Sequence, residues 1–358
     1  MMSEVPRNPR TFGIAVGTLL AAWFALTMPG CGIGYLAQQG FFQAELLAGR
    51  KPISKAIASG ELTPAEVNTL NLVPKIKAFG RSIGLAATEN YDTINPAWQR
   101  TIWNVSACEP LAFRAKTYWF PIVGTVPYLG YFREGDARER ARELQSEGYD
   151  IHVRTAGAYS TLGWFRDPVL RSMLRWDEIS LSETLLHELA HATLWIRGSV
   201  QFNESFANFV GEEASLRYIA DSYGNDSDPM KRLIKGRADS KAFRSMLHTV
   251  YEDLDRVYRD VALTDETQKI RKIAILSSIS DRTRALRLHD AERYLRNVQS
   301  SEWNNARLMQ FRTYNRSPEW FAKLLEQEHG NLSAFILRID QITKNADDPY
   351  AALRAATR

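Results

Sequence analysis

The sequence of 358 residues has few cysteines, little net charge and only one long apolar run. Its two cysteines, Cys31 and Cys108, cannot form a disulfide framework, and a chain of this length needs none to bury a core. Lysine and arginine number 45 against 41 aspartates and glutamates, a net charge of +4 that is spread along the chain. Because a nucleic-acid-binding protein is expected to carry a strongly basic stripe, we expect no nucleic-acid partner. The hydrophobic content of 45% excludes disordered and collagen-like classes.

The one long apolar run lies near the N-terminus. Residues 12–28 carry no charge and follow Arg7 and Arg10, which is typical of an export signal. The run ends at Gly30-Cys31, and a small residue before a cysteine resembles the lipobox of bacterial lipoproteins. The resemblance implies that residues 1–31 are a lipoprotein-type signal peptide and that Cys31 is acylated. The alternative is an uncleaved membrane anchor, because the run is only a little shorter than the ~20 residues that span a bilayer.

Both alternatives place the remaining chain outside the cytoplasm, held at a membrane. Gly32 rather than an aspartate follows Cys31, so retention at the inner membrane is not signalled. We therefore expect a lipid-anchored protein of the bacterial cell envelope, at the outer membrane and facing the periplasm. Cys108 would then be a single thiol, and we expect it to be a buried apolar residue rather than a nucleophile.

The rest of the sequence divides into three stretches. Residues 32–106 have a helical pattern, with a capped helix start at residues 63–66. Residues 107–225 mix strand patterns at 118–120 and 149–154 with a charged helix at 136–147. Residues 226–358 are predicted to be almost entirely helical. The pattern indicates an α+β protein that is mainly helical.

Residues 187–191 read His-Glu-Leu-Ala-His, an H-E-x-x-H motif. Two positions four apart on a helix lie ~6 Å apart along its axis and ~40° apart around it, so the imidazoles of His187 and His191 can bind one metal ion. Glu188 lies about 100° around the helix from His187, beside the metal, where a base for a water molecule is needed. Because the surrounding residues are apolar nearly all round the helix, these polar groups would be costly without a partner charge. A zinc ion, Zn²⁺, is the simplest explanation.

The flanking residues predict where this helix and the next one begin and end. Residues 180–183 have the form of a capping box, and Gly198 is placed to end the first helix after Arg197. Asn203 is a good N-cap for a second helix, which would put Glu204 in its first turn. The resulting helical hairpin would return Glu204 to His191 as the third metal ligand, a set typical of hydrolytic zinc sites. The alternatives for that ligand are Glu212 and Glu213.

Asn203-Glu204 after H-E-x-x-H is similar to the gluzincin class of metallopeptidases, although the 12 residues between His191 and Glu204 are a shorter interval than in its thermolysin-like members. The chain more closely resembles a bacterial family catalogued as "Putative aminopeptidase". The resemblance lies in VGTVPYLGYF (123–132), AYSTLGWFRDPVL (158–170), LLHELAHATLW (185–195), FNESFANFVGEEA (202–214) and WNNARL (303–308). It implies a zincin-like catalytic core over residues 107–225, with a small mixed or antiparallel sheet, and a helical C-terminal region over residues 226–358.

The resemblance also implies roles for neighbouring segments. In zincin folds the strand beside the active-site helix pairs with the substrate backbone, and residues 156–162 are the candidate for that edge. Tyr159 would then donate a hydrogen bond to the developing oxyanion. The alternative donors are Tyr131, Tyr218 and Tyr314.

Together these features predict a zinc-dependent peptidase, in first place an aminopeptidase. His187, His191 and Glu204 would hold one Zn²⁺, Glu188 would be the general base, and the partner would be a peptide. The alternatives are a zinc endopeptidase, a peptidase of peptidoglycan stems, and a catalytically silent envelope zinc protein. An aminopeptidase needs an acidic residue for the α-ammonium group of its substrate, and the sequence does not distinguish between four nearby candidates, Glu178, Glu183, Glu212 and Glu213.

Overall fold

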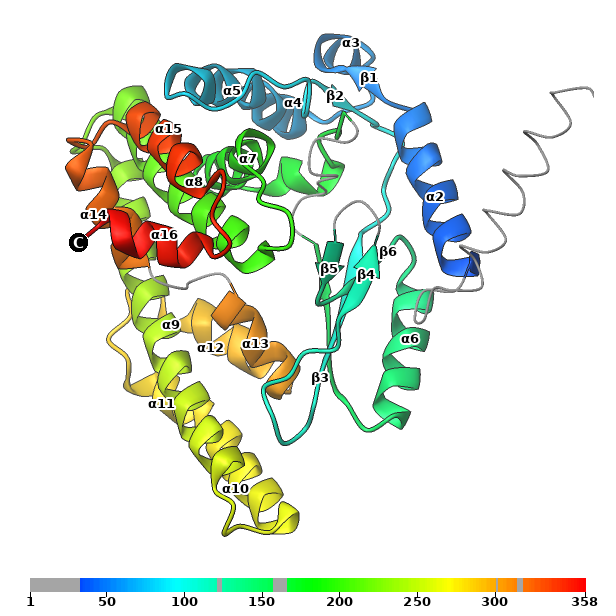
Figure 1. Ribbon diagram of the computed structural model, residues 1–358. Coiled ribbons are helices and arrows are strands. Elements are labelled where there is room, and N and C mark those ends of the chain that lie inside the picture. The colour runs from blue at the N-terminus through cyan, green and yellow to red at the C-terminus, as the bar shows by residue number, and fades with distance from the viewer. Residues whose placement is uncertain (1–32, 121–123, 157–165, 301, 314–317) are drawn as a thin grey trace, which may run out of the picture. The chain divides into compact units, whose positions relative to one another are not determined.

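The computed structural model describes residues 33–120, 124–156, 166–300, 302–313 and 318–358 (Figure 1). Contacts divide the chain into two units, Met1–Ala48 and Gly49–Arg358. The first unit contains helix α2 (Ile33–Ala48). Within the described ranges, no helix has both the length and the apolar character needed to span a membrane. The predicted signal peptide and Cys31 lie outside these ranges.

The second unit begins with short elements that lead to the helix carrying the H-E-x-x-H motif. Strands β1 (Lys51–Pro52) and β2 (Thr93–Ile94) pair antiparallel, and helices α3 (Ile53–Ala58), α4 (Pro64–Leu70) and α5 (Leu72–Ser82) lie between them in sequence. Helix α4 begins where the sequence predicts, because the side chains of Thr63 and Glu66 cap each other's backbone N–H groups. Gly80 brings α5 close to α7 (Glu178–Thr193), since a Cβ there would lie 3.2 Å from the Leu189 side chain.

The main sheet has three antiparallel strands in the order β6 (Leu129–Tyr131), β3 (Trp103–Cys108) and β7 (Asp150–Thr155). A separate hairpin joins β4 (Tyr118–Phe120) to β5 (Gly124–Val126). Helix α6 (Glu134–Ser146) contacts all three strands of the main sheet, and α13 (Asn305–Thr313) contacts β3 and β7. Cys108 is buried in β3, and burial raises the pKa of its thiol to about 12, so the thiol stays protonated. The small antiparallel sheets confirm the α+β, mainly helical class.

Helices α7 and α8 (Val200–Tyr223) form the predicted hairpin and pack along each other (Figure 1). The predicted ends of α7 were wrong. The helix begins at Glu178 because the Asp177 carboxylate accepts a hydrogen bond from the Ser180 backbone N–H at 2.8 Å, which makes Asp177 the N-cap. It ends at Thr193, before an extended residue, and Gly198 lies in the connecting loop with φ +81°.

The predicted role of Asn203 as an N-cap was also wrong. Helix α8 begins at Val200, three residues before Asn203, and Asn203 lies fully buried inside the helix. Its side chain accepts a hydrogen bond from the Ile196 backbone N–H at 2.9 Å and donates one to the Ile196 carbonyl at 2.8 Å. Asn203 therefore ties the α7–α8 loop to the start of α8 and holds the next residue, Glu204, toward α7.

The C-terminal helices form two groups. They follow α8 in the chain, whereas a short helix, η1 (Arg171–Arg175), precedes α7 and belongs to neither group. Helix α9 (Asp228–Arg259) packs with α10 (Asp265–Ser277), α11 (Ile279–Ala285) and α13, and α12 (Ala291–Gln299) packs on α11. Helices α14 (Pro318–Gln327), α15 (Leu332–Thr343) and α16 (Pro349–Ala356) pack together, and α14 contacts α8. Aromatic contacts among Phe206, Phe209, Phe321 and Phe335 fasten α14 and α15 to α8.

The two hydrogen bonds between the Asn203 side chain and the Ile196 backbone predict that Asn203→Ala lowers the stability of the protein. The substitution leaves the partly buried Ile196 backbone N–H without its partner, whereas the Ile196 carbonyl still accepts a hydrogen bond from the Ser199 N–H at 3.1 Å. An unsatisfied group of this kind costs about 1–3 kcal/mol. We expect the free energy of unfolding of the metal-free protein to fall by about 1–3 kcal/mol, measured by urea denaturation with a chelator present. Asn225→Ala, at an exposed position, is the matched control. Equal urea midpoints for the two variants would show that the tie has no energetic role.

Candidate metal centre

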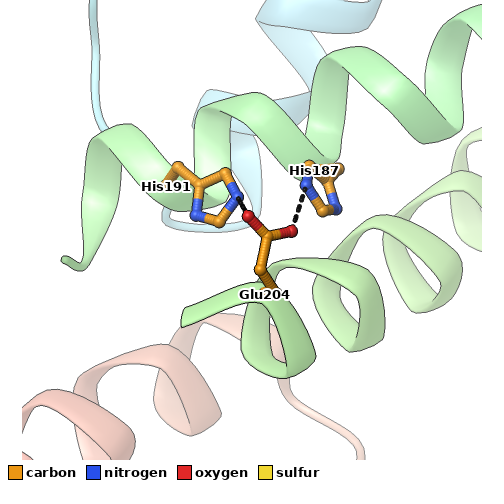
Figure 2. Close-up of side chains that lie close together, drawn as sticks. All are labelled: His187, His191 and Glu204. Atoms are coloured by element: carbon orange, nitrogen blue, oxygen red, sulfur yellow. Dashed lines mark ion pairs between the residues drawn. The ribbon is translucent and has the colours of Figure 1, made fainter. Parts of the chain in front are cut away.

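Two imidazoles and one carboxylate converge between α7 and α8 (Figure 2). The Nε2 atom of His187 lies 3.6 Å from one carboxylate oxygen of Glu204, and the Nε2 atom of His191 lies 3.6 Å from the other. The three candidate ligand atoms lie within 4.8 Å of one another. Zinc holds nitrogen and oxygen ligands at about 2.1 Å, so two ligands of a tetrahedral ion are about 3.4 Å apart. The donor types and their spacing therefore suit a zinc ion.

The protonation states of the three groups also suit a metal. Burial, together with the nearby His191, lowers the pKa of His187 to about 4, so its imidazole is neutral at physiological pH. Burial opposes the charged form of Glu204, but the neighbouring imidazole of His191 lowers the pKa of this carboxyl. Burial likewise opposes charge on His191, and the Glu204 carboxylate nevertheless raises its pKa. A cation would take the place of a proton on His191 and would compensate the buried negative charge of Glu204.

Glu188 lies beside the three ligands and is not one of them. It lines a cavity of about 950 Å³ together with His187, and its negative charge contributes to the raised pKa of His191. Residues of α7, α8, α9 and the 289–294 segment form most of the wall. The arrangement therefore places a carboxylate and one of the three candidate ligands, His187, on the wall of the same cavity.

The two alternative third ligands are occupied elsewhere. Glu212 pairs with Arg244 at 3.4 Å, and Glu213 pairs with Arg217 at 3.1 Å. In the described part of the chain, Glu204 is the carboxylate that groups with the two histidines.

The structure leaves the predicted oxyanion donor as a prediction. Tyr159, Tyr314 and residues 157–162 of the predicted substrate edge lie outside the described residues. Tyr131 is buried in β6, and Tyr218 donates a hydrogen bond to Glu178 at 2.8 Å. Neither is among the described residues that line the cavity.

Three residues near the centre were missed at the level of sequence. Asn208 hydrogen-bonds to His187. Gly211 lets the helices approach, since a Cβ there would lie 3.1 Å from the His187 Cβ and 2.9 Å from the Glu183 carbonyl. Arg154, near the end of β7, lines the cavity, and its charge helps to lower the pKa of Glu204. Asn208 and Gly211 follow Glu204 by four and seven residues, a spacing that puts Glu204, Asn208 and Gly211 on one face of α8. This spacing could have identified Asn208 and Gly211 from the sequence.

The class of protein is that of a mainly helical chain with a candidate metal centre. This centre is formed by the H-E-x-x-H motif on α7 and by Glu204 on α8. The family model described as "Putative aminopeptidase" matches residues 34–352. The chain belongs to this family, which confirms the resemblance seen in its sequence and supports a peptidase activity. No curated protein and no solved structure shows significant similarity to the chain.

The ligand geometry predicts which carboxylate controls zinc binding. We expect the wild-type protein to retain about one zinc ion per chain after dialysis, and Glu204→Ala to lose it, because a His₂ pair alone leaves two positions unfilled. Asn208→Ala should weaken zinc binding by about 10–100-fold, as is typical when the partner of a ligating histidine is removed. Zinc content by atomic absorption and competition with a chromophoric chelator measure both effects.

Glu212→Ala is the matched control for this experiment, because it removes a carboxylate from the same helix. It should leave zinc affinity unchanged. Loss of zinc from Glu212→Ala, with zinc retained by Glu204→Ala, would move the third ligand to Glu212.

Proposed function

We propose that this protein is a zinc-dependent peptidase and that it acts as an aminopeptidase. The observation that carries the proposal is the convergence of His187, His191 and Glu204, together with a cavity that is lined by His187 and by Glu188. Family membership supports peptide hydrolysis, and the donor set supports zinc. When bound, zinc would polarise the carbonyl of the scissile peptide bond and would make a water molecule a better nucleophile.

Glu188 is the proposed general base. Its carboxylate takes a proton from the attacking water as the oxygen of that water forms a bond to the carbonyl carbon. The same carboxyl then delivers the proton to the departing nitrogen as the C–N bond breaks, so the products are a carboxylic acid and an amine. Tyr159 is the proposed hydrogen-bond donor to the oxyanion.

The size and chemistry of the cavity support a peptide substrate. A volume of about 950 Å³ lies at the upper end of the range of ligand sites in proteins and could take several residues. Its wall carries both signs of charge, as the zwitterionic ends of short peptides require. We also propose, from the sequence alone, that the chain is exported and anchored through a lipid on Cys31, at the outer membrane and facing the periplasm.

The role of Glu188 predicts a variant that separates metal binding from turnover. Glu188→Gln keeps the size of the side chain and removes its basicity, so zinc content should be unchanged while kcat falls by about 10²-fold or more. Hydrolysis of a peptide library, followed by mass spectrometry, measures the loss. Glu252→Gln, at an exposed position on α9, should retain full kcat. Wild-type turnover by the Glu188→Gln variant would remove Glu188 from the mechanism.

The type of peptidase follows from a second measurement on the wild-type protein. An aminopeptidase should cleave peptides with a free N-terminus and should leave their N-acetylated forms intact. Equal cleavage of the two forms would identify an endopeptidase, and a panel of peptidoglycan stem peptides would test that substrate class. Stoichiometric zinc without cleavage of any of these peptides would indicate a catalytically silent zinc protein.

A further inference from the structure

The structure distinguishes the four carboxylates that could bind a positively charged group of the substrate. Glu178 accepts hydrogen bonds from the phenols of Tyr218 and Tyr223. Glu212 is paired with Arg244, and Glu213 is paired with Arg217. Each of these three carboxylates therefore already has a partner within the protein.

Glu183 differs from the other three. It lies on α7 one turn before His187, is half-buried, and lines the same cavity as His187 and Glu188. Among the described residues, its carboxylate takes part in no hydrogen bond or ion pair. Side chains four apart on a helix are about 5–6 Å apart at Cβ, so the Glu183 carboxylate is within reach of a group bound next to the metal centre.

The nearest positive charges on the protein do not neutralise Glu183 by contact. Burial raises the pKa of the Glu183 carboxyl, and the charges of Arg237 and Arg244 oppose this shift only through space. Arg237 donates its hydrogen bonds to the Glu212 carbonyl and the Ser215 hydroxyl, and Arg244 pairs with the Glu212 carboxylate. A carboxylate that is partly removed from water and has no contact partner gains most from a cation that arrives with the ligand.

We propose that Glu183 binds a cationic group of the peptide substrate next to the scissile bond, either its α-ammonium group or a basic side chain. The inference rests on the proposed peptidase function. In an aminopeptidase the α-nitrogen lies about 2.5 Å from the carbonyl carbon under attack, because only Cα separates them. The group that binds this nitrogen must therefore lie close to the metal, and Glu183 is the cavity-lining carboxylate on the turn of α7 next to His187.

Peptide binding, measured without turnover, tests this assignment. The zinc-loaded Glu188→Gln protein is titrated by calorimetry with four alanine-based hexapeptides, whose N-terminus is free or acetylated and which carry lysine or norleucine at one position. The titrations are repeated after adding Glu183→Gln, which conserves size and removes the charge. A hydrogen bond to a charged group corresponds to about 10-fold or more in affinity, so the cationic member of a pair should lose at least that factor while the neutral member is unchanged.

The arms of the test identify the source of the charge. A loss confined to free N-termini assigns the α-ammonium group to Glu183, and a loss confined to lysine peptides assigns a basic side chain. Glu178→Gln is the matched control, because it removes a carboxylate from the same helix that already has two phenol partners; it should leave both affinity ratios unchanged. Equal affinity ratios with and without Glu183→Gln, an equal loss for charged and neutral peptides, or the absence of peptide binding would overturn the inference. Because the assay needs no hydrolysis, a failure of the peptidase proposal in the turnover assay is a separate result.

Discussion

The site depends on one buried electrostatic arrangement, the Glu204 carboxylate held between the imidazoles of His187 and His191. A negative charge in the interior is costly unless a cation or several donors compensate it. The protein brings these groups together with two helices that run side by side. Gly211 allows their close contact, and Asn203 fixes the loop that joins them. The contacts that fold the hairpin are therefore the same contacts that hold the three candidate metal ligands together.

Helix α7 supplies most of the chemistry along one stretch of its surface. His187 and His191 are four residues apart and face Glu204, whereas Glu188 is turned about 100° and borders the cavity. Glu183 lies one turn earlier on the same cavity wall. One rigid helix would then carry the two histidine ligands, the general base Glu188 and the substrate-binding Glu183. A rigid helix keeps the distances between these side chains constant. Sites built on helices are more precise than sites built on loops, so a buried α7 suits this use.

The sequence predicted the helical hairpin and the grouping of His187, His191 and Glu204, because backbone geometry sets the spacing of side chains along a helix. It was wrong about the helix ends. Asp177, Ser180 and Asn203 can all cap a helix, and the contacts around them decide which one does so. It also missed Asn208, whose role depends on how α8 packs against His187. Contacts between helices are not encoded in the periodicity of either helix alone.

The central claim is that these three side chains hold one zinc ion. X-ray absorption spectroscopy of the zinc-loaded protein at the zinc edge tests it most directly. The account predicts a four-coordinate ion with two imidazole nitrogens at about 2.0–2.1 Å and oxygen ligands at about 2.0–2.2 Å. A spectrum without histidine scattering, or one that includes sulfur at about 2.3 Å, would contradict the account.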